Sequence, residues 1–170
     1  MAILLAFDDS LMHELLHKNI SYFIHAPRSS QISYAYTMAN LTLAEQKKFT
    51  SYYKKKVDYV MERLRSMGAA MPDTTYRVEA TFFVLGHFKD LFGLPLPIEA
   101  ARALQRTGPV KTDEDIAYYL LFNDALMVTP LSYFGLPDDQ GFLRITCSGN
   151  AKELKDMMDR LEARLISARK

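Results

Sequence analysis

The chain has 170 residues, of which 49% are hydrophobic and 24% charged, so it can form one packed domain, or one domain and part of another. Its formal net charge of +1 disfavours a nucleic-acid-binding surface, because neutralising phosphates requires an excess of basic residues. A single cysteine, Cys147, excludes an internal disulfide and is typical of a reducing compartment, so we expect a cytoplasmic protein. The apolar segment that opens the sequence is too short to cross a bilayer, so we expect no membrane-spanning segment.

The N-terminal part of the sequence predicts one strand and two helices. Residues 1–7, MAILLAF, are apolar like a buried strand and too few to cross a bilayer. Ser10 is a suitable cap for a short helix that runs to about Lys18. After an extended loop, Ser29 or Ser30 is expected to begin a second helix.

The clearest predicted helix follows these elements. Thr42 and Glu45 have the spacing of a capping box, and Gly68 is a suitable end for the helix. Such a long helix cannot be buried on every side, so only one face is expected to pack. That face carries Phe49, Tyr53, Val57, Val60, Met61 and Leu64.

The remaining sequence mixes strands with helices. In chain order, it predicts a long strand over 76–88, a helix from Pro97 that ends at Gly108, a helix capped by Thr112, strands over 125–129 and 141–148, and a last helix capped by Asn150 with Glu153. The expected fold class is α+β, with a small, mostly antiparallel sheet and helices packed on one of its faces.

The segment GFLRITCS, residues 141–148, alternates in the manner of a strand with one buried face. Leu143 and Ile145 should point to the helices, and Arg144 to the opposite face. A guanidinium is too costly to bury unpaired, so Arg144 must meet water, an acidic side chain or an anion from outside. If this face adjoins another domain, Arg144 points into a cleft.

A separate motif, HELLH over residues 13–17, suggests a different chemistry. His13 and His17 lie one helical turn apart and could bind one Zn²⁺, with Glu14 as the general base of a metallopeptidase. A catalytic zinc needs a third protein ligand, but the extended motif would place it at Phe23, and the next carboxylate downstream is Glu45. A chance pair of exposed histidines is the alternative.

Two motifs follow one another near the end of the chain, VTPLSYFG over 128–135 and GFLRIT over 141–146. They resemble the V-x-P-G-x-x-F-G turn and the G-x-x-R-I/L-S/T strand in the carboxy-terminal part of pyridoxal-phosphate-dependent aminotransferases of fold type I, the aspartate aminotransferase superfamily. The resemblance extends over nearly the whole chain. It implies that Arg144 binds the substrate α-carboxylate in the intact enzyme.

The same resemblance implies two domains and an incomplete catalytic site. Residues 1–41 would be a remnant of the large, cofactor-binding domain, and residues 42–170 the small domain. The family's Schiff-base lysine stands in a serine-lysine context just before the strand that residues 1–7 resemble, and no lysine of this sequence has that context. We therefore expect no catalytic residue in this chain, and no tight binding of pyridoxal phosphate by the chain alone.

The resemblance also implies partners. An amino acid and a 2-oxo acid would be the substrates of the intact enzyme. The loop IHAPRSS is similar to a family segment at the dimer interface, so His25 and Arg28 are candidates for contacts with the active site of a second subunit in a homodimer. Leu131 stands where the family has glycine, which leaves the substrate's identity open. A third hypothesis is a non-enzymatic role in which the chain binds or regulates an intact subunit.

Overall fold

The computed structural model describes residues 7–22 and 26–170. The chain divides between Lys48 and Phe49 into two compact units, and this division falls inside α3, Leu43–Ser66. Of the strand expected over residues 1–7, all but Phe7 lies outside the described residues.

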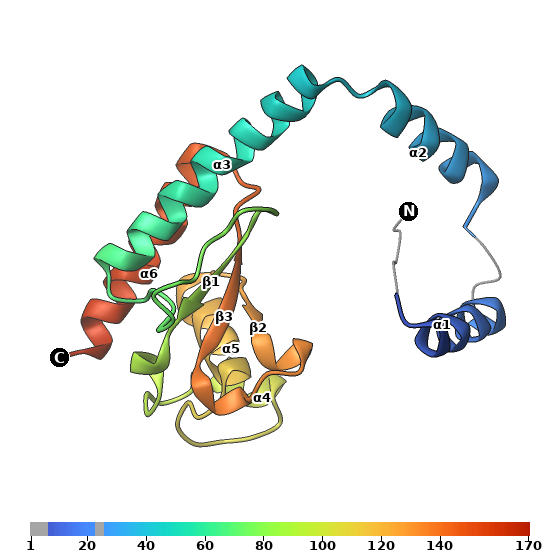
Figure 1. Cartoon of the computed structure of the whole chain (residues 1–170). Helices are drawn as coiled ribbons and strands as arrows, with labels where there is room; N and C mark the ends of the chain where they lie inside the picture. Colours follow the sequence, from blue (N-terminus) through green and yellow to red (C-terminus); the bar gives the residue numbers. More distant parts are fainter. Residues whose placement is uncertain (1–6, 23–25) are drawn as a thin grey trace. The chain divides into compact units, whose positions relative to one another are not determined.

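The first unit is helical, as the sequence predicts. α1 spans Asp9–Tyr22 and α2 spans Arg28–Asn40 (Figure 1). The Asp8 carboxylate accepts a hydrogen bond from the Leu11 N–H at 2.7 Å at the start of α1. The prediction that Ser10 caps this helix was therefore wrong, because Ser10 lies within its first turn.

The long helix α3 is capped as predicted. The Thr42 N–H donates to Oε2 of Glu45 at 2.9 Å, and the Glu45 N–H donates to Oγ1 of Thr42 at 3.3 Å. The Thr42 hydroxyl also donates to Oε2 of Glu45 at 2.7 Å, and this bond, followed by that from the Thr42 N–H, lowers the pKa of the Glu45 carboxyl. Gly68 follows the helix with a φ of 71°, which suits glycine.

The second unit contains a three-stranded antiparallel sheet. Its strands are β1, Phe83–His87, β2, Thr129–Pro130, and β3, Phe142–Thr146, in the order β1-β3-β2. Val84, Leu143 and Ile145 share one face and are buried, which confirms the predicted alternation along β3.

The helices of the second unit complete an α+β fold, which confirms the predicted fold class. α4 spans Ile98–Ala103, α5 spans Asp113–Asp124 and α6 spans Ala151–Ala168. The predicted cap of Asn150 with Glu153 is present on α6, and Thr112, predicted as the cap of α5, forms a capping box with Asp115. Three short 3₁₀ segments join these elements: Lys89–Leu91, Leu131–Phe134 and Asp138–Gln140.

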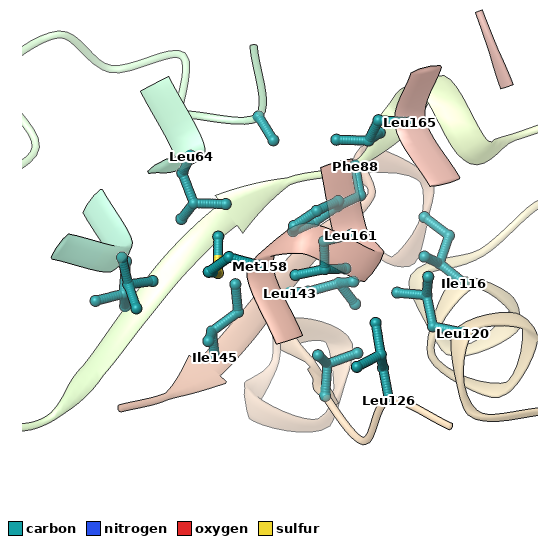
Figure 2. Packing of buried hydrophobic residues seen from close by; sticks show 14 of the residues in the cluster. Leu64, Phe88, Ile116, Leu120, Leu126, Leu143, Ile145, Met158, Leu161 and Leu165 are labelled. Carbon is teal, nitrogen blue, oxygen red and sulfur yellow. The ribbon is translucent and has the colours of Figure 1, made fainter. Parts of the chain in front are cut away.

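The core lies between the buried face of the sheet and the helices. Figure 2 shows side chains of β3, α5 and α6 meeting in one cluster. α3 and α6 lie side by side (Figure 1), and Arg63 on α3 forms ion pairs at 2.9 Å with Asp159 and Glu162 on α6. The labelled members of the cluster are Leu64, Phe88, Ile116, Leu120, Leu126, Leu143, Ile145, Met158, Leu161 and Leu165.

The strand predicted over 76–88 is much shorter in the structure, where only Phe83–His87 pairs. Thr81 has a φ of 73°, a left-handed conformation that interrupts an extended chain. The Leu85 N–H donates to the Tyr76 hydroxyl at 2.9 Å, so the preceding segment covers part of the free edge of β1 instead of extending the strand.

Two other predicted boundaries were wrong. Of the strand predicted over 125–129, only Thr129 pairs with β3, together with Pro130 outside that range, because Ala125 adopts a φ of 51° as the C-cap of α5. The helix predicted to end at Gly108 is α4, which already ends at Ala103. After α4 the chain turns at residues 104–105, where Gln105 has a φ of 54°.

Burial predicts the most sensitive positions for stability. We expect Leu161→Ala on α6 to lower the free energy of unfolding by about 2–5 kcal/mol, because Leu161 is fully buried and its truncation leaves a cavity. Ile166→Ala, on the same helix but 52% exposed, should change it by less than about 1 kcal/mol. Urea unfolding measures both changes, and equal losses in the two variants would contradict the packing described here.

Candidate functional site: an arginine without an acidic partner

Arg144 lies in the middle of β3, on the sheet face opposite the core. Its neighbours across the strands are Leu85 on β1 and Thr129 on β2. The side chain is half-buried, whereas the adjacent Leu143 and Ile145 are fully buried. The period of β3 therefore directs the guanidinium away from the helices, as the sequence predicts.

Two aromatic rings contact the guanidinium. The Cζ atom of Arg144 lies 4.2 Å from the ring centroid of Phe83 on β1, and 4.7 Å from that of Phe134. Both distances fall within the range of cation–π attraction. The rings stabilise the positive charge, but they do not accept its N–H hydrogen bonds, because these donors point outward in the plane of the guanidinium.

No acidic side chain among the described residues forms an ion pair with Arg144. The Nε atom of Arg144 is buried and has no hydrogen-bond partner among the described residues. Other arginines of the second unit do form ion pairs with carboxylates, namely Arg63, Arg106, Arg160, Arg164 and Arg169. Arg144 thus keeps donor capacity that the described chain does not use.

The turn that carries Phe134 is attached to the start of α5. The Ser132 N–H donates to Oδ2 of Asp113 at 2.8 Å, and the Ser132 hydroxyl donates to Oδ1 of the same carboxylate at 2.7 Å. The Tyr133 hydroxyl donates to Glu114 at 2.7 Å, and this hydrogen bond raises the pKa of Tyr133 to about 12. These contacts hold the segment 131–134 beside β3.

The strand residues on the Arg144 face suit a carboxylate better than a cofactor. They are aromatic, aliphatic or threonine side chains, with one histidine: Phe83, Leu85, His87, Thr129, Phe142 and Thr146. Within the paired strand positions there is no lysine amine for a Schiff base and no acid to hold a pyridinium nitrogen. Pyridoxal phosphate therefore does not fit these residues.

The HELLH residues form no larger metal site. His13 and His17 lie on α1 with their ring centroids 5.1 Å apart, and both are exposed, as is Glu14. Over residues 7–22 and 26–170, no group of three or more potential ligands is close enough to hold a metal ion. The structure thus offers the histidine pair without the third ligand that a catalytic zinc requires.

The predicted interface loop lies partly outside the described residues. His25 lies outside the described residues. Arg28 is the first residue of α2 and is exposed. Nothing in the first unit tests its contact with a second subunit, so that contact stays a prediction.

Two cavities lie beside the segment 70–82. One, of about 590 Å³, is lined by Met61, Tyr76 and Leu85 among others. The other, of about 1040 Å³, lies between α3 and residues 77–82.

No described helix is both long enough and apolar enough to span a membrane.

The sequence analysis did not predict Phe83 as a neighbour of Arg144, nor Asp113 as the partner of Ser132 in the turn that carries Phe134. The structure brings Phe83 and Phe134 to the arginine from two separate segments. The only sequence signal was the aromatic residue in the SYFG turn shortly before β3. No local pattern links that turn to Asp113, which lies 19 residues from Ser132.

Solved aminotransferase structures resemble this chain. The aspartate aminotransferase from Rhizobium meliloti is 25% identical over 76% of this chain and 29% of its own, with a TM-score of 0.58. The aromatic aminotransferase from Pyrococcus horikoshii OT3 is 22% identical over 81% of this chain and 32% of its own, with a TM-score of 0.57. An aminotransferase from Mycobacterium tuberculosis is 17% identical over 94% of this chain and 36% of its own, with a TM-score of 0.64. The chain spans about a third of the length of these proteins. No protein-family model and no curated protein matches the sequence.

The environment of Cys147 yields a prediction about reactivity. Burial raises the pKa of this thiol from 9.0 to about 11, so its thiolate fraction at pH 8 is about a hundredfold lower than that of an ordinary cysteine. We expect a thiol reagent at pH 8 to modify the folded protein at least about a hundredfold more slowly than the protein in urea. Comparable rates in the two states would contradict the buried position.

Proposed function

Since the chain has the fold of part of a pyridoxal-phosphate-dependent aminotransferase of fold type I, we propose that it takes part in the transfer of amino groups between an amino acid and a 2-oxo acid. In this proposal Arg144 binds the α-carboxylate of the substrate. The observation that carries it is the guanidinium on the free face of the sheet, which pairs with no acid of the described chain.

The geometry of Arg144 supports recognition of a carboxylate. A guanidinium presents parallel N–H donors that match the two oxygens of a carboxylate, and these charge-assisted bonds are stronger than neutral ones. Phe83 and Phe134 contact the cation without using its donors, so they restrict its position and leave the hydrogen bonds to a ligand. A lysine at this position would supply charge but no fork of donors.

We place the cofactor outside this chain. Pyridoxal phosphate supplies the electron sink of transamination when it is bound, but the strand residues beside Arg144 do not fit it. The proposal therefore gives this chain a substrate-binding role and assigns transamination to the intact enzyme. A homodimer in the cytoplasm, in which His25 and Arg28 reach a second subunit, completes the proposal.

Carboxylate binding by Arg144 tests the first part. We expect 2-oxoglutarate and phenylpyruvate to shift the Nε–H resonance of Arg144 in a saturable way, because the anion should approach that guanidinium. Arg144→Gln should weaken binding at least about tenfold, and Arg144→Lys should restore only part of it. Titration by NMR spectroscopy and calorimetry measures both effects.

The matched control is Arg102→Gln, which removes an exposed arginine on α4 and should leave the affinity unchanged. An uncharged amide analogue of each acid should not bind. Equal affinity in the Arg144→Gln and Arg102→Gln variants would remove Arg144 from the proposal.

The expected location of the cofactor has its own test. When the purified chain is incubated with pyridoxal phosphate and reduced with borohydride, we expect only scattered, substoichiometric labelling of its lysines, since none has the context of the family's Schiff-base lysine. Peptide mapping by mass spectrometry measures the distribution. One lysine labelled to completion would show that the chain holds the cofactor itself.

A further inference from the structure

Asp113 is a buried carboxylate whose two oxygens serve one residue of a distant turn. It is the first residue of α5 and is fully buried. Oδ2 accepts the Ser132 N–H at 2.8 Å, and Oδ1 accepts the Ser132 hydroxyl at 2.7 Å. Among the described residues no cation forms an ion pair with Asp113, so these donors and the start of the helix are what stabilise its charge.

Capping does not explain Asp113. The N-terminus of α5 already has a complete capping box, in which Thr112 accepts from the Asp115 N–H and Asp115 accepts from the Thr112 N–H. Burying a further carboxylate costs free energy unless its oxygens accept hydrogen bonds. The bonds of Asp113 go to the turn Leu131–Phe134, which indicates that its role is to fix that turn.

The turn Leu131–Phe134 also contributes to the surroundings of Arg144. Phe134 lies two residues after Ser132, and its ring is 4.7 Å from the guanidinium carbon. Because the Phe134 side chain is 55% exposed, core packing does little to hold it in place. Its position against Arg144 therefore depends on how firmly the backbone of the turn is attached.

We propose that Asp113 is a positioning residue for Arg144, acting through Ser132 to hold Phe134 against the guanidinium. This inference rests on the proposed function only for its effect on substrate, because Arg144 must first bind a carboxylate. Without the Asp113–Ser132 hydrogen bonds, the turn moves more freely and Phe134 no longer restricts the cation. The Arg144 guanidinium keeps its own charge, while the orientation of its donors becomes less defined; Ser132→Ala breaks the hydroxyl hydrogen bond without changing any charge.

The experiment compares Asp113→Asn and Ser132→Ala with the unchanged chain, using two readouts. The first is the Nε–H resonance of Arg144, which nearby aromatic rings displace from its ordinary position. We expect both variants to move this resonance towards its value in Phe134→Leu. The second is the affinity for 2-oxoglutarate, which should fall about threefold to tenfold, as expected for the loss of one cation–π contact.

Two controls separate positioning from general damage. Asp115→Ala breaks the capping box of α5 and lowers stability, but it leaves the Asp113–Ser132 bonds, so the Arg144 resonance should not move. In the Phe134→Leu background, Asp113→Asn should have no further effect on Arg144, since the ring through which it acts is gone. If Asp113→Asn does not fold, Ser132→Ala, which keeps the backbone bond, carries the comparison.

The outcomes distinguish this inference from the proposed function. An Arg144 resonance that stays unchanged in both variants overturns the positioning role, whether or not the carboxylate binds. A displaced resonance in a chain that binds no 2-oxoglutarate supports positioning and counts against the proposed function. Additive effects of Asp113→Asn and Phe134→Leu on the resonance would also overturn the role assigned to Asp113.

Discussion

The whole arrangement depends on the two-residue period of β3. Leu143 and Ile145 must be buried to close the core, and the same period turns Arg144 to the other face of the sheet. A permanently charged group on a partly covered face needs stabilisation, and two aromatic rings provide some of it without using its hydrogen-bond donors. The packing of the core thus places on the other face a cation whose Nε donor has no partner among the described residues.

The two buried aspartates at the start of α5 show how neighbouring residues of one type come to have different roles. Asp115 closes the capping box and forms an ion pair with Arg106, so its role is local. Asp113 reaches Ser132 across the molecule and ties the helix to the turn beside β3. Acidic residues in the first turn of a helix are stabilised by its dipole, and here one of them also links two elements.

The likeness to aminotransferases is a likeness of fold at low sequence identity, and it gives the arginine its context. A paired strand that fixes the arginine and the absence of a competing acid both favour a carboxylate-binding role, and β3 meets both conditions within the described residues. The chain spans about a third of the length of those proteins, so the chemistry proposed for it is one part of a larger site.

The sequence by itself determined the helix caps at Thr42, Thr112 and Asn150 and the facing of β3, because these depend on residues within about four positions of one another. The length of β1 was not predictable, since the hydrogen bond that the Leu85 N–H donates to the Tyr76 hydroxyl and the left-handed conformation of Thr81 determine where pairing begins. The contacts of Arg144, with two aromatic rings and with no carboxylate of the described residues, follow from the tertiary structure. That outcome depends on which side chains distant segments bring to one face, and no local pattern encodes it.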